Sequence, residues 1–393
     1  MFKISKKISK ALGRAGVLFT SHGEIQTPAF VTVGTKATVK SLSPEQVKEI
    51  SSQVVLANTY HLYLEPGEKI IKKASGLHNF MNWQGPIMTD SGGFQAFSLG
   101  AAYGNKLSKF IGEESPAQEE IDEAYREARE KKAKITEDGV EFKSIIDGSA
   151  HFFSPEKSIQ IQNDLGADII FTFDECTSPH ASKEYLKEAM QRTHRWAERC
   201  LVEHKNGKQQ LFGIIQGGRY EDLRKESAKA IAGMEFGGFG IGGSFVKEDM
   251  ATAVKWVNEI LPEEKPRHLL GVGEPVDLIL GVENGCDTFD CVAPTRIARN
   301  GALYTKRGKI NIMNAKYKNV LEPIEKDCGC YTCKNYTAAY ISHLFRAKEM
   351  FAATLASIHN IYFLNNLMSQ IRESILNNKF FEFKEEFLRN YKL

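Results

Sequence analysis

The sequence lacks any long apolar run. None of its hydrophobic stretches is long enough for a membrane-spanning helix, and the basic opening MFKISKKISKALGRAG is not followed by the apolar core of a signal peptide. Internal repeats and low-complexity linkers are absent as well. We therefore expect a cytoplasmic globular protein without membrane contact, whose 393 residues are enough for one large domain or two smaller ones.

Cysteine is also scarce. There are seven cysteines, an odd number in a long chain, which argues against a disulfide framework. Three of them, Cys328, Cys330 and Cys333, form a C-x-C-x2-C cluster that delivers three thiolates from one tight turn. An iron–sulfur cluster would normally need a fourth cysteine nearby, whereas a structural zinc ion needs one more cysteine or histidine ligand. His343 and His359 are the candidates, and helical spacing puts His359 on the packed face of its segment.

Neither positive nor negative charge is in large excess, because the net charge of the whole chain is +2. It is unevenly distributed, however. Residues 296–393 hold 16 basic and 8 acidic side chains, a net charge of +8, and the remaining 35 basic and 41 acidic side chains give −6. A solvated lysine-rich surface is the ordinary explanation of such an asymmetry, and a chain that docks a polyanion on one side would also show it.

Eight short apolar runs recur along the chain. They occupy residues 28–35, 54–61, 86–93, 168–176, 211–218, 238–244, 268–273 and 288–292. Their near-continuous hydrophobicity is typical of parallel strands that are buried on both faces. Helix-like segments separate most of them, and two of these (43–50 and 154–166) open with Ser-Pro-Glu, which favours a helix start. Eight such units predict an α/β fold of the (β/α)8 TIM barrel type, because a doubly wound sheet would not need eight.

Polar residues gather at the carboxyl ends of these runs, where a barrel of this type carries its chemistry. They are Asn58, Asp90, Asp174, Gln216, Gly242, Gly243, Gly271 and Asp290. Taken singly, Asp90 before Gly-Gly suits a turn, Asp174 a helix cap, and Asp290 an ion pair with a nearby arginine. Together the three aspartates make a two-carboxylate glycosyl-transfer site plausible, with one nucleophile and one general acid/base.

Two segments do not fit the alternation. Residues 105–141 are highly charged and predict an exposed, partly helical insertion, followed by a hairpin around VEFKSIIDGS. After Asn300 the alternation stops, and the cysteine cluster is followed by amphipathic helices. We expect a catalytic barrel over residues 1–300 and a C-terminal zinc-binding, helical subdomain over residues 301–393 that packs on it.

Seven motifs make the pattern specific. They are NTYHL, TDSGGFQ, FDECT, QGG, GVGEP, FDCVAPTRIARNG, and the C-x-C-x2-C cluster with a histidine 26 residues after its last cysteine. With these motifs the chain resembles the bacterial-type tRNA-guanine transglycosylases, also called the queuine tRNA-ribosyltransferase family, over nearly its whole length. The resemblance implies a (β/α)8 barrel with a zinc subdomain, usually homodimeric. The implied reaction exchanges the wobble guanine of tRNAs with a GUN anticodon for the 7-aminomethyl-7-deazaguanine precursor of queuosine, through a covalent enzyme–tRNA intermediate.

The resemblance also implies roles for individual residues. Asp290 would be the nucleophile that attacks the ribose, Asp90 the general acid/base, and Asn58 would orient Asp90. The 7-deazaguanine base would be bound by Asp90, Ser91, Gly92, Gly93, Phe94, Asp174, Cys176, Gln216 and Gly243. The tRNA anticodon loop would be held by Gly271, Val272, Gly273, Glu274, Pro275, Val276, Asp277, Thr295, Arg296, Ile297, Ala298 and Arg299. One structural zinc ion per chain would be bound by Cys328, Cys330, Cys333 and His359.

Two features depart from the family pattern. Residues 242–248 read GGSFVKE where most bacterial members have Gly-Gly-Leu-Ala-Val-Gly-Glu, so Ser244 and Phe245 alter the pocket wall near the incoming substituent. Glu248 still offers a carboxylate that favours an aminomethyl cation, and the bulk of Phe245 disfavours the larger base queuine. The charged segment 105–141 is longer than the family leads us to expect.

Three alternatives compete with this hypothesis, besides an enzyme that uses queuine. An archaeal-type enzyme acts elsewhere in the tRNA and normally carries extra C-terminal RNA-binding domains, for which 393 residues leave no room. A non-catalytic tRNA-binding partner subunit is expected to lack the catalytic aspartates, whereas Asp90 and Asp290 are both present. An unrelated glycosidase needs two carboxylates, but it needs neither TRIAR nor the zinc cluster.

Overall fold

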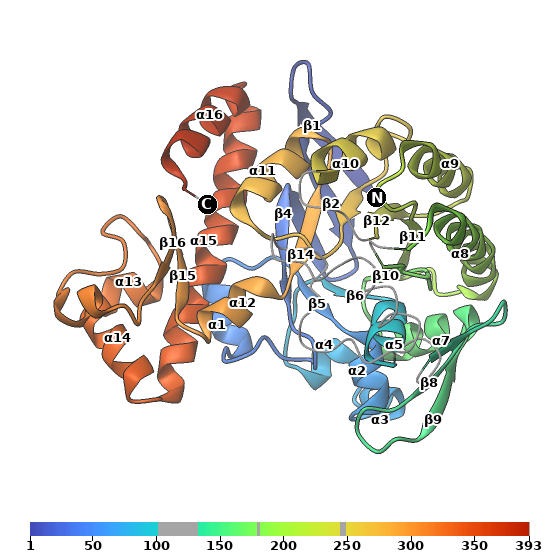
Figure 1. The fold of residues 1–393 in the computed structure, drawn as a ribbon, viewed down its shortest axis with the longest axis horizontal. Coiled ribbons are helices and arrows are strands. Elements are labelled where there is room, and N and C mark those ends of the chain that lie inside the picture. The colour runs from blue at the N-terminus through green and yellow to red at the C-terminus, as the bar shows by residue number, and fades with distance from the viewer. Residues whose placement is uncertain (101–132, 179–180, 244–248, 393) are drawn as a thin grey trace.

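Eight parallel strands close into a barrel, as the alternation predicts (Figure 1). The computed structural model describes residues 1–100, 133–178, 181–243 and 249–392. In order around the barrel the strands are β4 (Ala29–Val33), β5 (Val55–Ala57), β6 (Ile87–Thr89), β10 (Ile169–Phe171), β11 (Gln210–Ile215), β12 (Gly238–Ile241), β13 (Arg267–Leu269) and β14 (Thr288–Cys291). Each of them lies within one of the eight apolar runs or begins one residue before it, so the predicted (β/α)8 class is confirmed.

The continuous hydrophobicity of the strands follows from burial on two faces. Val31, Ile169 and Ile214 pack together in one cluster that fills the barrel interior. Their neighbours in sequence, such as Ile170 and Ile215, belong to a second cluster under the surrounding helices. Because successive side chains of a strand point to opposite faces, a strand buried on both faces has no position for an exposed polar residue.

The two Ser-Pro-Glu segments form helices as predicted. Ser43 caps α1 (Pro44–Glu49) in a capping box with Gln46, and Ser154 caps α7 (Pro155–Leu165), which ends at Gly166 in the left-handed conformation. Among the described residues, the other helices before barrel strand β14 are α2 (Thr59–Leu64), α3 (Glu68–Lys73), α4 (Leu77–Phe80), α5 (Gly93–Gly100), α8 (Lys183–Glu203), α9 (Glu221–Ala232), α10 (Met250–Asn258) and α11 (Pro275–Glu283).

An antiparallel sheet that the sequence pattern did not indicate precedes the barrel. It consists of β1 (Phe2–Lys7), β2 (Arg14–Thr20) and β3 (Gly23–Thr27). The turn between β2 and β3 is tied to the barrel through Asp168, the residue before β10. The buried Asp168 carboxylate accepts hydrogen bonds from His22 Nδ1 at 2.7 Å, from His78 Nε2 at 3.2 Å and from the Ile87 N–H at 2.9 Å. These hydrogen bonds lie at the amino ends of the barrel strands, opposite the polar residues of the candidate site.

The prediction that residues 105–141 form an exposed, partly helical insertion is wrong for the last of them, residues 133–141. Residues 133–141 hold β7 (Ala133–Ile135) and the start of β8 (Val140–Lys143), which pair with β9 (Ala150–Phe153) in an antiparallel sheet. Val140 and Phe142 are buried, because alternate residues of β8 face the barrel side. The hairpin predicted around VEFKSIIDGS is confirmed as β8 and β9. The rest of the insertion, residues 105–132, lies outside the described residues.

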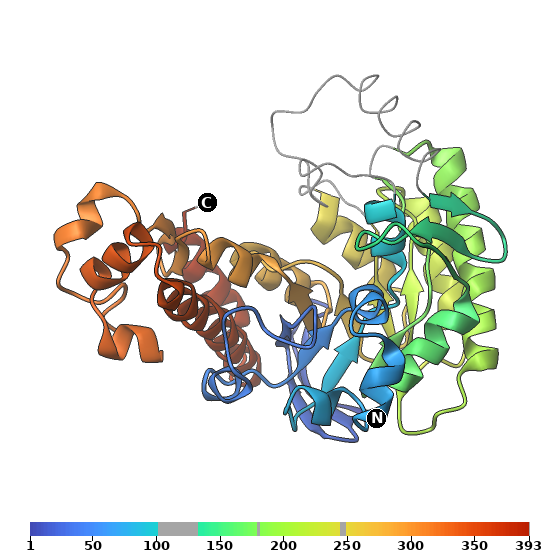
Figure 2. The same cartoon turned by 90° about the horizontal axis from the view of Figure 1, so that it is seen from below.

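The C-terminal part is built around one long helix. It contains α12 (Ala293–Ala298), β15 (Ala302–Thr305), β16 (Gly308–Asn311), a 3-10 turn (Ala315–Asn319), α13 (Tyr331–Asn335), α14 (Ala338–Arg346), α15 (Met350–Leu376) and α16 (Phe380–Asn390). The 27-residue helix α15 contacts α12, α13 and α14 as well as barrel strand β4. Figure 2 shows this part, in orange and red, extending to one side of the barrel.

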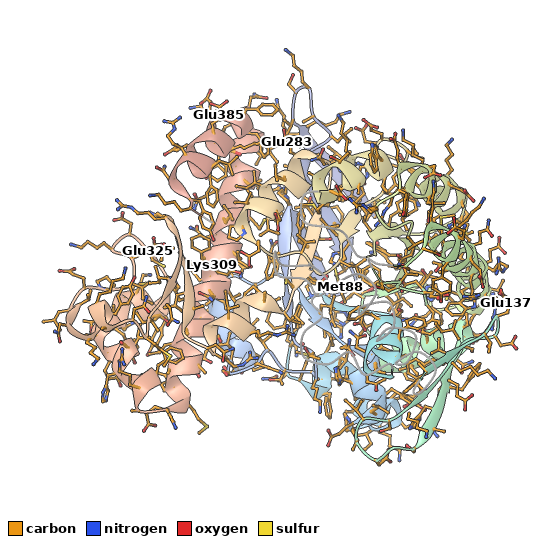
Figure 3. All side chains as sticks on the ribbon, viewed as in Figure 1. Met88, Glu137, Glu283, Lys309, Glu325 and Glu385 are labelled. Carbon is orange, nitrogen blue, oxygen red and sulfur yellow. The ribbon has the colours of Figure 1, made fainter. Side chains whose placement is uncertain are left out.

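Hydrogen bonds attach α15 to the N-terminal sheet, and an ion pair attaches α16 to barrel helix α11. Arg372 of α15 donates to the Gly16 carbonyl and to Gln26, both at 2.7 Å. Lys384 of α16 pairs with Glu283 of α11 at 2.6 Å, and Glu283 faces the end of the molecule that carries α16 (Figure 3). Within the described residues no helix combines the length and the apolar character that crossing a bilayer requires.

Candidate active site and metal centre

Asp90 lies directly after β6 and is held by residues at the end of β5. Thr59 N–H donates to Asp90 Oδ1 at 2.9 Å, and Asn58 Nδ2 donates to Asp90 Oδ2. The Asn58 amide cannot flip, because its Oδ1 accepts the His61 N–H at 3.0 Å and thereby caps α2. Asn58 therefore presents its N–H2 group to the carboxylate, as expected for the residue that orients Asp90.

The surroundings of Asp90 favour its protonated form. Burial and, to a smaller extent, the negative charge of Asp290 raise the pKa of Asp90 to about 7, against the hydrogen bond from Thr59. A carboxyl group that titrates near neutral pH can both donate and accept a proton under physiological conditions. The electrostatic coupling also means that Asp90 and Asp290 lie in one site.

Asp290, on β14, is held in a different way. Its Oδ1 accepts hydrogen bonds from the Gly271 N–H at 2.9 Å and from His268 Nε2 at 3.1 Å. Since a carboxylate can only accept, the His268 proton is on Nε2, and Nδ1 faces the Thr288 hydroxyl at 2.9 Å. His268 is fully buried inside the barrel. Two donors on one oxygen fix the carboxylate orientation and stabilise its ionised form.

A second group of polar residues surrounds the Asp174 carboxylate, after β10. Ser91 Oγ donates to Asp174 Oδ1 at 3.2 Å, and Gln216 Nε2 donates to Asp174 Oδ2 at 2.6 Å. The chain approaches very closely here: a Cβ on Gly93 would lie 2.8 Å from the Asp174 carbonyl oxygen. The strand ends of β6, β10 and β11 thus bring Ser91, Asp174 and Gln216 together, as the base-binding hypothesis requires.

The remaining base-binding candidates lie on the same end of the barrel. Phe94, in the first turn of α5, is 37% exposed, and Cys176 is half-buried two residues after Asp174. Gly243 has a positive φ of 94°, which an L-residue rarely adopts. Gly92 also has a positive φ, 77°. Residues 244–248, which carry the departure from the family pattern, lie outside the described residues.

The candidate tRNA-binding segments differ in exposure. Arg296, on α12, is exposed, whereas the half-buried positions are Gly271, Glu274, Val276, Ile297 and Arg299. The side chains of Val272, Pro275, Asp277, Thr295 and Ala298 are buried, as is Gly273. Gly271 has a second contact, because its N–H binds Asp290. Arg296 and the half-buried members of both segments are thus the ones that reach the surface, and we call this edge of the site the rim.

Basic side chains from a second loop join Arg296 and Arg299 at this rim. Lys36 and Lys40, between β4 and α1, are both exposed. Burial lowers the pKa of Lys40, and the positive charges of Arg299, Arg296 and Lys36 lower it further. Across the described ranges, no carboxylate comes within ion-pair distance of Lys40, Arg296 or Arg299. The two lysines were not predicted from the sequence, because they are far from Arg296 along the chain.

The cysteine cluster and a histidine from α15 come together in the C-terminal part. The Sγ atoms of Cys328, Cys330 and Cys333 lie 3.9, 3.6 and 3.4 Å from His359 Nδ1. His359 Nε2 donates to the Tyr304 carbonyl at 2.7 Å, which leaves Nδ1 as the ligand atom. His343 is exposed on α14 and is not part of the group. Three sulfurs and one nitrogen at these separations fit a tetrahedral metal site.

Taken together, the barrel, its paired carboxylates and the Cys3His group define a (β/α)8 enzyme with a metal-binding appendage. Comparison with known proteins gives the family. Residues 9–393 match the family model described as queuine tRNA-ribosyltransferase. The chain belongs to this family.

Individual relatives match over nearly the full length. A queuine tRNA-ribosyltransferase of Thermoanaerobacter pseudethanolicus is 52% identical over 99% of this chain and 97% of its own length. The proteins of the same name from Desulforamulus reducens and Fusobacterium nucleatum are 49% and 48% identical, and each comparison covers 97% or more of both chains. The chain is thus similar to these bacterial proteins over nearly its whole length and theirs.

Proposed function

We propose that this chain is a tRNA-guanine transglycosylase that replaces the wobble guanine of tRNA by a 7-deazaguanine base through a covalent intermediate. One observation carries the proposal: two carboxylates of one site have opposite environments. The two donors to Asp290 favour its ionised form, whereas burial raises the pKa of Asp90 to about 7. Pairs of carboxyl groups whose surroundings separate their pKa values are typical of a nucleophile with a general acid/base.

The exchange then follows in two balanced steps. Asp290 attacks C1′ of the ribose while the bond from C1′ to N9 of guanine breaks, and Asp90 supplies a proton to the departing base. The ribose remains attached to Asp290 as an ester-like adduct. In the second step the incoming base loses its proton to Asp90 and attacks C1′, which releases Asp290. One N-glycosidic bond replaces another, so no nucleotide hydrolysis is needed.

Base recognition is assigned to the cluster around Asp174. A carboxylate accepts two N–H bonds from the amine and ring edge of a guanine-like base, a geometry that few other side chains offer. Ser91 and Gln216 hold that carboxylate, and Phe94 offers an exposed ring on which the base can stack. These contacts read ring edges common to guanine and 7-deazaguanines, so they select the class of base and not its substituent.

The aminomethyl base is the proposed incoming substrate. The sequence GGSFVKE supports it, because Glu248 suits a small cation and Phe245 adds bulk against the cyclopentenediol of queuine. The test combines guanine-loaded tRNAs of several anticodons with a mixture of labelled bases. Incorporation of the aminomethyl base at the wobble position of GUN tRNAs alone is expected. Preferred incorporation of queuine, or exchange elsewhere in the tRNA, would contradict this substrate assignment.

The anticodon loop is proposed to dock on the basic rim formed by Lys36, Lys40, Arg296 and Arg299. Among the described residues Lys40, Arg296 and Arg299 have no carboxylate within ion-pair distance, whereas Lys36 pairs with Glu65 at 3.1 Å. Positive side chains without such a partner are available to phosphates, and a base taken out of its stack needs flanking phosphates held in place. The rim adjoins Asp290 through the chain, since Arg296 follows it by six residues. The reaction needs the tRNA backbone to be held beside the nucleophile, and the rim is placed to hold it.

Zinc is the proposed occupant of the Cys3His group, one ion per chain. The donor set of three thiolates and one imidazole suits zinc, and four protein ligands leave no position for substrate, so the ion would be structural. It would join the loop of Cys328 to α15, the helix that also packs on barrel strand β4. The reaction steps above involve only side chains of the barrel.

A homodimer is also proposed. Aromatic side chains cluster on the C-terminal part: Tyr336 stacks on Tyr340 with ring centroids 5.3 Å apart, and Phe351 packs edge-on against Tyr336. Tyr331 and Met350 enlarge the patch, and Met350 is 88% exposed. An exposed apolar patch of this kind is typical of an interface, and a second copy of the chain is its proposed partner.

A further inference from the structure

Arg224 is a buried arginine that the reaction scheme does not use. It lies in the first turn of α9, and its side chain has no exposure to solvent. Its Nε donates to the Gly218 carbonyl at 2.7 Å, and its Nη1 donates to the Gly242 carbonyl at 2.8 Å and to the Ile215 carbonyl at 3.4 Å. One guanidinium thus joins the ends of two neighbouring barrel strands, β11 and β12.

The three carbonyls flank the residues assigned to base recognition. Ile215 and Gly218 enclose Gln216, and Gly242 precedes Gly243. A Cβ on Gly243 would lie 2.8 Å from Arg224 Nη2 and 2.9 Å from Gln216 Oε1. The guanidinium, the Gln216 amide and the Gly243 backbone are therefore in direct contact, with no room for an added methyl group.

This contact continues to the base-binding carboxylate. Gln216 Nε2 donates to Asp174 Oδ2 at 2.6 Å, and the Gln216 N–H is itself held by Ser227 of α9 at 3.2 Å. Helix α9 thus fixes Gln216 from two sides, through Ser227 and through Arg224. Arg224 reaches the three carbonyls from two different nitrogens of its planar guanidinium, whereas the donors of lysine all lie on one nitrogen and those of glutamine on one amide.

We propose that Arg224 is a positioning residue, which sets the geometry of Gln216 and Gly243 for recognition of the purine-like base and does not itself touch the base. The inference rests on the proposed function, because it assumes that these two residues bind the base. Burial of the guanidinium lowers its pKa to about 9, so it stays largely charged at neutral pH. Its hydrogen bonds to carbonyls are therefore of the stronger, charge-assisted kind.

The experiment separates base recognition from tRNA recognition. Guanine exchange is measured for the full-length chain and for Arg224→Gln and Arg224→Lys, first with guanine varied at saturating tRNA and then with tRNA varied at saturating guanine. Arg224→Gln is expected to raise the KM for guanine about tenfold or more, as for the loss of a hydrogen bond from a charged group, while the KM for tRNA stays within about twofold. Arg224→Lys retains the charge, so its KM for guanine is expected to lie between those of the unmodified chain and Arg224→Gln.

Arg267 provides the matched control. It is also a buried arginine that donates to a backbone carbonyl, that of Leu261 at 2.8 Å, but it lies at the start of β13, at the other end of the barrel. Arg267→Gln is expected to lower the melting temperature without changing the KM for guanine. The control keeps a general loss of stability apart from a specific loss of base recognition.

Three results would overturn the proposal. They are an unchanged guanine KM in Arg224→Gln, an equal rise of both KM values, or the same guanine effect in Arg267→Gln. If Arg224→Gln does not fold, Arg224→Lys decides alone: a lower turnover with an unchanged guanine KM contradicts the positioning role. Absence of exchange in the unmodified chain would overturn the proposed function and this inference with it, whereas normal exchange with unaffected Arg224 variants would remove only the positioning role.

Discussion

At the scale of single residues, surroundings and not residue type decide the proposed roles of the two carboxylates. One oxygen of Asp290 accepts hydrogen bonds from two donors, His268 and the Gly271 N–H, and both stabilise the negative charge of Asp290. Asp90 is half-buried near that charge, and desolvation together with the charge raises its pKa to about 7. The same type of side chain is therefore proposed to serve as a nucleophile at one strand end and as a proton carrier at another.

The raised pKa of Asp90 predicts a pH-dependent stability. Its folded pKa of about 7 lies above the ordinary value of 3.8 for an aspartate, so the folded state binds the proton more tightly. The associated stability is present below about pH 4 and is lost as the pH rises through about 7. Asp90→Asn removes this loss, so its melting temperature relative to the unmodified chain should increase between pH 5 and pH 8. Thermal unfolding at several pH values measures the difference.

Asp168 is a control of opposite sign. Burial alone would raise the pKa of Asp168, but hydrogen bonds from His78, the Ile87 N–H and His22 lower it overall. Its stability contribution is present at neutral pH and is lost as the pH falls through the folded pKa. Asp168→Asn should therefore destabilise the protein most at neutral pH. A difference for Asp90→Asn that does not change with pH would show that Asp90 is ionised in the folded protein throughout.

At the scale of helices and strands, continuous apolar runs and helix caps could be predicted, because both are local properties of the chain. All eight barrel strands and the starts of α1 and α7 belong to this group. The candidate site followed from them, since polar residues after strand ends converge in any such barrel. Asp90, Asp174 and Asp290 were found in this way.

Other features depend on contacts between distant segments and could not be predicted. His268 looks like an ordinary strand residue until β13 and β14 pair and bring it beside Asp290. Residues 133–141 are rich in charge, yet alternate positions are buried once β8 pairs with β9. Lys36 and Lys40 precede Arg296 by more than 250 residues, so their shared rim exists only in the folded barrel.

The basic rim predicts a salt-dependent affinity for tRNA. Each phosphate contact contributes a slope of about one to the dependence of log Kd on log salt concentration. Arg296→Ala, Arg299→Ala and Lys40→Ala should each weaken binding and reduce the slope by about that amount. Binding titrations at several salt concentrations measure it. Lys7→Ala, an exposed lysine of β1 that pairs with Glu263, should leave the slope unchanged, and native slopes in all three rim variants would place the docking face elsewhere.

The metal site predicts a coupled loss of zinc and stability. Cys330→Ser should lose most of the bound zinc and melt at a lower temperature, because a structural metal site contributes its binding energy to folding. His359→Ala should behave alike, whereas His343→Ala should keep one zinc ion per chain, since His343 is exposed on α14. Metal analysis by mass spectrometry together with thermal unfolding provides both readings. Full zinc content in His359→Ala would contradict the proposed ligand set.

At the scale of the whole molecule, the barrel and the C-terminal part have separate proposed tasks. The barrel carries the candidate reaction site, and the C-terminal part carries the metal group and the aromatic patch of Tyr331, Tyr336, Tyr340, Met350 and Phe351. Helix α15 belongs to both, because it holds His359 and also packs on β4. One helix, α15, thus connects the aromatic patch to the barrel.

The patch predicts self-association. Sedimentation equilibrium should give twice the mass of one chain at micromolar concentration, and Met350→Glu should shift the equilibrium towards the single chain by placing a charge in an apolar interface. Val202→Glu is the matched control, because Val202 is 71% exposed on α8, away from the patch. If the unmodified protein sediments as a single chain, the aromatic patch has a different partner.

The covalent step is the central claim, and trapping the adduct tests it most directly. The protein is incubated with guanine-containing tRNA, denatured, and separated by electrophoresis under denaturing conditions. The unmodified chain should yield a band at the combined mass of one chain and one tRNA, which disappears on addition of excess guanine. Asp290→Asn should form no such band and should lose exchange by on the order of 10⁴-fold or more, while it still binds tRNA. An adduct formed by Asp290→Asn, or near-native exchange without any adduct, would contradict Asp290 as the nucleophile.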